Sequence, residues 1–140
     1  MTLTMDFEPL ADEALRQFIT NGVDNHNIAM TGEASWYPVN YVLRSEAGEI
    51  GGGLLGQVWG GWLEMKILWV AEAHRGQGYA ARLLAAAETY ALQRGARSAT
   101  LDTHNPSAQA LYERLGYSEI GRLENYPQGF AKVFLSKLLV

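Results

Sequence analysis

The 140-residue sequence contains no cysteine. This absence excludes disulfide bonds, thiolate metal sites and a cysteine nucleophile. A long hydrophobic run is also missing, because the longest uncharged apolar stretch, GGGLLGQVWGGWL, is rich in glycine and too short to span a bilayer. The first ten residues include Asp6 and lack the apolar segment of a signal peptide. We therefore expect a soluble, cytoplasmic protein with no membrane partner.

The sequence also lacks a cluster of basic residues. Lysine and arginine number 11 against 15 aspartate and glutamate residues, which gives a formal net charge of -4. This balance argues against nucleic acid as the main partner and suits a cationic substrate such as an amine. Hydrophobic residues make up 48% of the chain, enough for a core. The length is that of one ordinary domain, so we expect a single domain over residues 1–140.

Hydropathy patterns in the first half predict one helix and several strands. TLTMDF alternates as a first strand, and residues 9–25 carry a helical stripe with Pro9 in its first turn. Residues 26–36 are interpreted as a loop. Strands follow, separated by turns at Ala47-Gly48 and Gly60-Gly61, and cover residues 39–45, 49–59 and 62–70.

The second half predicts two helices, one strand and a final strand pair. After Gly78, apolar residues recur at helical spacing and Gly95 ends the pattern: Ala80, Leu83, Leu84, Ala87 and Ala91. Residues 98–103 form a short strand. Asn105-Pro106 then begins a helix with Asn as its N-cap and Pro at the first position, and Gly116 ends it. The final strands cover residues 117–123 and 130–139.

The stretch HRGQGYAARLL predicts an anion site at the start of a helix. Free N–H groups and the helix dipole attract a phosphate there, Arg75 adds a charge, and glycines permit close approach of the backbone. A simple glycine-rich turn would have the same residues. A dinucleotide site is a further interpretation, since Gly76-x-Gly78-x-x-Ala81 fits its fingerprint and Asp102 ends the next strand. Against it, five residues separate Val70 from Gly76, and only 38 residues follow Asp102.

Two segments together resemble the GNAT superfamily of acyl-CoA-dependent N-acetyltransferases. Arg75-x-x-Gly78-x-Ala80 is similar to its pyrophosphate motif, and NPSAQALYERLGY is similar to its second conserved helix. The matching positions of that helix are Asn105, Ala108, Leu111, Tyr112, Gly116 and Tyr117. The resemblance implies an α/β (α+β) fold with a mixed, mostly antiparallel sheet of about six to seven strands. Helices flank this sheet, and its central strands splay apart.

The resemblance also implies acetyl-CoA as co-substrate and assigns residues to hold it. The backbone around the pyrophosphate is that of Arg75, Gly76, Gln77, Gly78, Tyr79 and Ala80. Main-chain groups of the strand that ends in Leu68, Trp69 and Val70 hold pantetheine, and the Asn105 side chain contacts the same arm. A splayed strand has free N–H groups, one of which can stabilise the oxyanion.

Tyr112 and Glu64 are the main candidates for proton transfer. Tyr112 matches the family's acid, which protonates the leaving thiolate, although its place on an apolar stripe also suits a core aromatic. Glu64 is the candidate base, on a strand among apolar neighbours, or it pairs with Lys66. His104, beside Asn105, is an alternative base. His74 is assigned to the pyrophosphate end, and His26 is a weaker candidate.

The acceptor is not named by any motif. A set of aromatic residues could wall an amine pocket or pack in the core: Trp36, Tyr37, Trp59, Trp62 and Tyr126. Glu33 and Asp24 could attract a cation. We expect direct transfer of acetyl from acetyl-CoA to a primary amine of an unidentified small molecule or peptide within a ternary complex, with no metal, and a homodimer through residues 118–138. The alternatives are a non-catalytic acyl-CoA-binding module and an NAD-binding protein.

Overall fold

The computed structural model describes all 140 residues, which form two compact units, Met1–Ala34 and Ser35–Val140. The first unit holds one helix, α1 (Glu13–Thr31). The Asp12 side chain caps it by accepting a hydrogen bond from the Leu15 backbone N–H at 2.8 Å. Gly32, at φ 78°, ends it and donates its N–H to the Ile28 carbonyl. None of the three helices of the chain is long and apolar enough to cross a membrane.

The structure corrects three expectations for this first unit. TLTMDF forms no strand, because alternation alone supplies no neighbouring strand to hydrogen-bond with. The helix begins at Glu13 and not near Pro9, since Asp12 provides a better cap. Residues 26–31, expected in a loop, continue the helix until Gly32 stops it.

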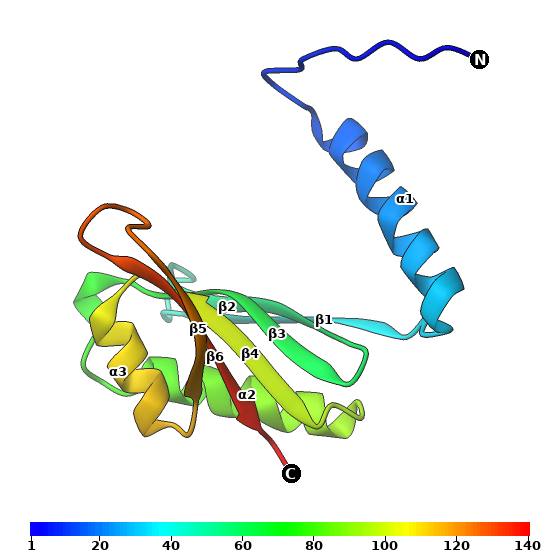
Figure 1. The fold of residues 1–140 in the computed structure, drawn as a ribbon. Coiled ribbons are helices and arrows are strands. Elements are labelled where there is room, and N and C mark those ends of the chain that lie inside the picture. Colours follow the sequence, from blue (N-terminus) through cyan, green and yellow to red (C-terminus); the bar gives the residue numbers. More distant parts are fainter. The chain divides into compact units, whose positions relative to one another are not determined.

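The second unit is built around one six-stranded sheet (Figure 1). Its strands are β1 (Trp36–Arg44), β2 (Ile50–Trp59), β3 (Trp62–Val70), β4 (Ser98–Thr103), β5 (Ser118–Glu124) and β6 (Ala131–Leu138). Their spatial order is β1-β2-β3-β4-β6-β5. Every neighbouring pair is antiparallel except β3 and β4. This confirms the mixed, mostly antiparallel sheet and excludes the largely parallel sheet of a dinucleotide-binding fold.

Two helices, α2 (Tyr79–Gln93) and α3 (Pro106–Arg114), lie against one face of this sheet (Figure 1). A short 3-10 helix, η1 (Glu72–His74), joins β3 to the start of α2. The predicted stripe of α2 is confirmed, since the buried residues of this helix are Leu83, Leu84, Ala87 and Ala91. The largest fully buried side chains, most of them from the strands, are Leu54, Leu63, Leu84, Leu135 and Val39. Each buried side chain of this size stabilises the fold by roughly 1.5–3 kcal/mol.

A polar cluster ties α2 to the sheet. Tyr117 is only 2% exposed, and its hydroxyl donates a hydrogen bond to Glu88 Oε2 at 2.7 Å. Lys137 Nζ on β6 contacts Glu88 Oε1 at 2.8 Å. Burial raises the pKa of Tyr117 well above its usual value, and the hydrogen bond to Glu88 raises it further. The cluster therefore holds a protonated phenol against a carboxylate beneath the helix.

Candidate active site

Strands β3 and β4 pair only at one end and then diverge. Their parallel register covers Trp62 with Ser98, Leu63 with Ala99 and Glu64 with Thr100, and it stops there. β3 continues to Val70, while β4 pairs with β6 along its other edge as far as Thr103. The main chain of β3 from residue 65 onward thus has no hydrogen-bonding partner on the β4 side. The splay implied by the family resemblance is present, and we call it the β3–β4 divergence.

A β-bulge lies at the start of the divergence. On the β2 side, Gly56 pairs with Met65 and Leu55 pairs with Ile67, so Lys66 is an extra residue without a partner. A bulge leaves its extra peptide unpaired and reverses the in-out alternation of the strand. Backbone N–H groups at the bulge are therefore available to a ligand. The sequence pattern of β3 gave no sign of this bulge.

The glycine-rich stretch forms the mouth of α2. Gly76 and Gly78 have φ of 76° and 82°, in the left-handed region that favours glycine. A Cβ atom added at either position would meet no atom within 4 Å, so both border open space. Gly78 caps α2 without a side-chain hydrogen bond, which leaves the first N–H groups of the helix for a ligand.

Arg75 links the end of β3 to this mouth. Its Nε donates to the Val70 carbonyl at 2.9 Å, which holds the exposed guanidinium beside the start of α2. The His74 ring lies close to Gly51 of β2, where an added Cβ would come within 3.0 Å of it, and edge-on to Tyr79. The predicted cluster of a cation, glycines and a helix N-terminus is thus brought together next to the open end of β3.

Asn105 caps α3, as predicted. Its side chain accepts a hydrogen bond from the Ser107 N–H at 2.8 Å, and its own N–H donates to Thr103 Oγ1 at 3.0 Å. These contacts use one side-chain oxygen lone pair and leave the amide NH₂ group for another partner. The cap therefore permits the side-chain contact to the pantetheine arm that the resemblance implies.

Tyr112 lies on α3 and is 7% exposed. Its ring meets that of Tyr117 edge-on, with 6.4 Å between centroids, and its hydroxyl forms no hydrogen bond within the chain. Burial raises the pKa of Tyr112, and the charge of Asp102 raises it further. The phenol is consequently protonated at neutral pH and has a proton available to donate.

Glu64 is the last residue of β3 that pairs with β4, and it lies on the face of the sheet opposite the buried Leu63 and Met65. Its Oε1 is 3.5 Å from the Gln57 amide nitrogen, and no basic side chain pairs with it. The alternative pairing with Lys66 is therefore absent. The carboxylate is an unpaired charge at the point where the two strands separate.

His104 lies away from Glu64. His104 follows the end of β4, four residues beyond Thr100, which is roughly 13 Å along an extended strand. Its Nδ1 lies 2.6 Å from the Tyr126 carbonyl oxygen, and its ring stacks on that tyrosine. His26 lies on α1 in the first unit, as does Asp24, and Glu33 follows that helix.

The aromatic set separates into two faces of the sheet. Tyr37 is on the α2 side, where Arg94 lies over its ring at 4.8 Å. Trp36, Trp59 and Trp62 stand directly opposite one another on β1, β2 and β3. Directly opposed residues project to the same face, so these three tryptophans form one row on the face of Glu64.

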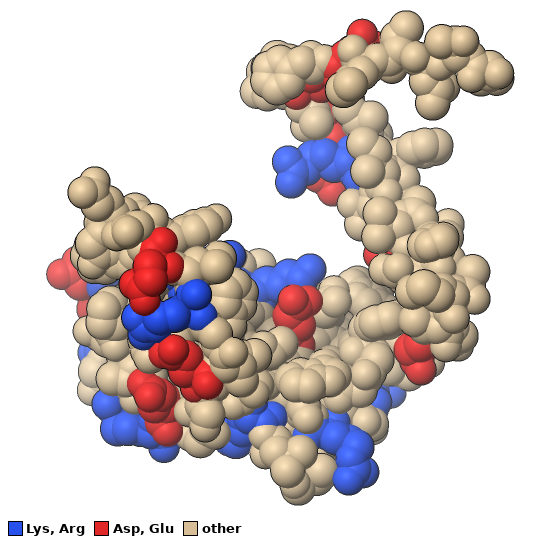
Figure 2. Space-filling model, viewed as in Figure 1, with Lys and Arg blue, Asp and Glu red and all other residues tan.

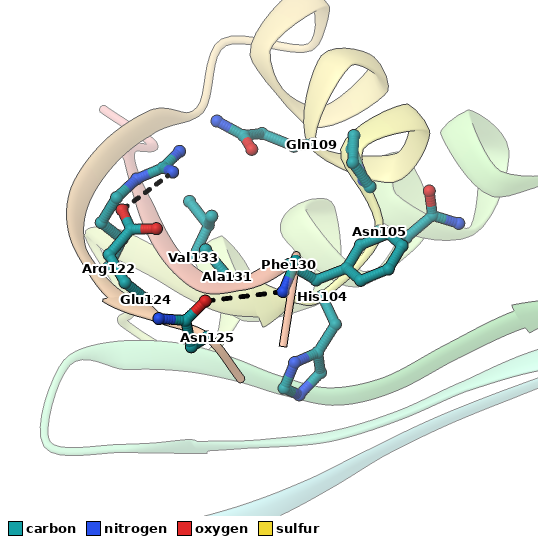
Figure 3. A pocket seen from close by; sticks show the side chains of 11 residues that line it. His104, Asn105, Gln109, Arg122, Glu124, Asn125, Phe130, Ala131 and Val133 are labelled. Carbon is teal, nitrogen blue, oxygen red and sulfur yellow. Dashed lines mark hydrogen bonds and ion pairs between the residues drawn. The ribbon is translucent and has the colours of Figure 1, made fainter. Parts of the chain in front are cut away.

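A cavity of about 450 Å³ lies between α3 and the β5–β6 hairpin, and its lining includes His104, Asn105 and Phe130. In Figure 3, Arg122 and Glu124 stand at one end and Asn105 at the other. Arg122 is already neutralised, because it pairs with Glu119 at 3.0 Å and with Glu124 at 3.3 Å. Of the residues that line this cavity, the sequence analysis named only His104 and Asn105 as candidate site residues, since the hairpin loop carries no pattern of its own.

The charged surface agrees with the composition. Figure 2 shows acidic and basic side chains interspersed on the visible face, without a broad patch of one sign.

Comparison with known proteins places this geometry in a family. Residues 8–117 match the Acetyltransferase (GNAT) family. Acetyltransferase Atu2258 of Agrobacterium fabrum is 38% identical over 128 residues, 91% of this chain and 93% of the relative. Blasticidin-S acetyltransferase of Streptomyces morookaense is 37% identical over 95 residues, 67% of this chain and 70% of the relative.

Among solved structures, a crystal structure of a protein from Agrobacterium tumefaciens is similar over 97% of this chain and 99% of its own. It has a TM-score of 0.90 and 36% identity. The GNAT family uses acetyl-CoA as co-substrate. The chain thus belongs to the GNAT family and is an acyl-CoA-dependent N-acetyltransferase.

Proposed function

We propose that the protein transfers acetyl from acetyl-CoA directly to a primary amine of a small molecule, within a ternary complex. One observation carries the proposal. The β3–β4 divergence leaves strand main chain open next to the glycine-rich mouth of α2, and the protonated Tyr112 belongs to the helix that follows β4. We infer that both units belong to one catalytic domain, because the family match of residues 8–117 includes all of α1.

The co-substrate is held in this proposal by backbone more than by side chains. Pyrophosphate binds the N–H groups at the mouth of α2, formed by Arg75, Gly76, Gln77, Gly78, Tyr79 and Ala80. The main chain of Leu68, Trp69 and Val70 faces the divergence and binds pantetheine, and the Asn105 amide completes the contact. The support is geometric, since these groups have no partner strand on that side and the glycines border open space.

The transfer forms a C–N bond and breaks the thioester C–S bond. The acceptor ammonium loses two protons on the way to the amide. One proton goes to solvent when the ammonium becomes the neutral amine, and Glu64 takes the other, directly or through water, because its carboxylate is unpaired at the start of the divergence. Tyr112 gives its proton to the leaving thiolate and is reprotonated from solvent. A backbone N–H at the Lys66 bulge stabilises the oxyanion.

A small-molecule acceptor is supported by one relative. The name of the Streptomyces protein gives blasticidin S as what it acetylates, and its match covers 67% of this chain. We also expect a cytoplasmic protein and a homodimer. β5 is an edge strand with Ile120 and Leu123 exposed, so a second β5 could pair with it.

The test is an acceptor panel of primary amines with acetyl-CoA, with thiol release and the mass of the acetylated amine as readouts. At least one amine should give both signals, and Glu64→Gln should lower kcat for that amine. Tight acetyl-CoA binding with no acetylated product across amines would contradict the proposal.

A further inference from the structure

The face of the sheet that carries Glu64 is arranged in rows across β1, β2 and β3. The tryptophan row consists of Trp36, Trp59 and Trp62, beside the Gly60-Gly61 turn. The next row on the same face consists of Pro38, Gln57 and Glu64, and we call its two polar members the polar row. The row of three large aromatic side chains thus lies next to the row that contains the unpaired carboxylate.

A hydrogen-bond relay connects the two rows. The Trp36 indole N–H donates to Gln57 Oε1 at 3.0 Å. An indole nitrogen can only donate, so the amide oxygen of Gln57 must face Trp36 and its NH₂ group must face Glu64. The 3.5 Å contact between Gln57 Nε2 and Glu64 Oε1 has this direction. Gln57 therefore orients both the Trp36 ring and the Glu64 carboxylate.

The dimensions of the rows define what would fit them. Strands lie about 4.8 Å apart, so the tryptophan row extends over roughly 10 Å, the width of one or two fused rings. Glu64 is two residues from Trp62 along β3, a separation of roughly 7 Å. Trp36 is 54% exposed and Trp62 is 44% exposed, so both offer aromatic surface outside the core.

We propose that the tryptophan row and the polar row form the acceptor site, and that it selects a primary amine carried two or three bonds from a flat ring. The ring lies on the tryptophans, and the ammonium group meets Glu64, which has no cation of its own. The amine then sits where β3 and β4 separate. The inference rests on the proposed function, because it assumes that this amine is acetylated.

Two probe amines isolate the contribution of the ring. 2-Phenylethylamine and 2-cyclohexylethylamine share the amine and chain length, but only the first has a flat aromatic ring. Titration calorimetry on CoA-saturated protein measures the Kd of each, and acetyl transfer is measured separately. Phenylethylamine should bind about three- to tenfold more tightly, the usual worth of an aromatic pair.

Matched variants locate the preference. Trp36→Leu and Trp62→Leu keep apolar surface but remove the flat rings, so each should reduce the preference. Val42→Ala changes an exposed apolar residue, 47% exposed, at the other end of β1 and should keep the preference. Thermal unfolding of every variant shows whether it folds.

The outcomes separate this inference from the proposed function. Equal Kd values for the two amines, or a preference that survives in both tryptophan variants, would overturn the acceptor site. Acetylation of other amines would then leave the proposed function standing. Ring-selective binding without any acetyl transfer would support the site and contradict the function. If neither amine binds and both tryptophan variants lose much of their stability, the tryptophan row is packed against other parts of the protein. That result would also overturn the acceptor site.

Discussion

Tyr112 is the residue whose chemistry the structure restricts most. Its hydroxyl makes no hydrogen bond within the chain, and burial together with Asp102 raises its pKa. Tyr112→Phe should lower kcat by about 10²- to 10⁴-fold, the usual contribution of general acid catalysis, with little change in acetyl-CoA affinity. Folding stability should hardly change, because no internal hydrogen bond is lost. A variant with normal turnover would show that Tyr112 is only a core aromatic.

Tyr117, five residues further on, should behave in the opposite way. Its hydroxyl is bonded to Glu88, so Tyr117→Phe should lower the free energy of unfolding by roughly 1–3 kcal/mol, measured by denaturant titration at pH 7. Because the phenol is buried, we expect its contribution to be structural.

Tyr117 should also make the free energy of unfolding depend on pH. Its folded pKa is raised above the unfolded value of 10.0. The stabilisation is therefore complete below pH 10 and is lost as pH rises from there toward the folded pKa. Wild-type stability should fall above pH 10 more steeply than that of Tyr117→Phe. Parallel curves for the two proteins would contradict this assignment.

At the scale of the element, the start of α2 carries the prediction for co-substrate binding. Asparagine tolerates positive φ, so Gly78→Asn should fold while its side chain occupies the open space of the phosphate site. The Kd for acetyl-CoA should rise about tenfold or more, the worth of one lost charge-assisted hydrogen bond.

Gly95, just beyond the other end of α2, supplies the matched control. It has φ 86° and also borders open space, so Gly95→Asn imposes the same backbone demand far from the mouth. Its acetyl-CoA affinity should equal that of the wild type. A fold-competent Gly78→Asn with unchanged affinity would show that the glycine-rich stretch is only a turn.

Most elements of the second unit could be predicted, because alternation and helical spacing are local signals. The cap at Asn105 and the glycines at the two ends of α2 are equally local signals, and the sequence analysis identified each of them. The bulge at Lys66 and the end of β3–β4 pairing were not visible in the residues themselves, because both depend on the register between strands. The strand predicted at TLTMDF was wrong for a related reason, since an alternating segment still needs a neighbouring strand to hydrogen-bond with. Likewise, the contact of Trp36 with Gln57 joins residues 21 positions apart.

At the scale of the whole molecule, sheet topology creates the site. β4 pairs with β6 along its full length but with β3 only at one end. The divergence therefore sits in the middle of a continuous sheet, with α2 and α3 on one face and the tryptophan row on the other. Two substrates can approach such a site together, which is what direct transfer requires. The absence of cysteine removes the usual nucleophile for a covalent acyl-enzyme.

Two-substrate initial rates test direct transfer most immediately. Rates are measured for an acceptor from the amine panel at several fixed acetyl-CoA concentrations, and reciprocal rates are plotted against reciprocal amine concentration. A ternary complex predicts lines that intersect, because both substrates must be bound before any product leaves. Parallel lines, the signature of a covalent acetyl-enzyme, would contradict the account.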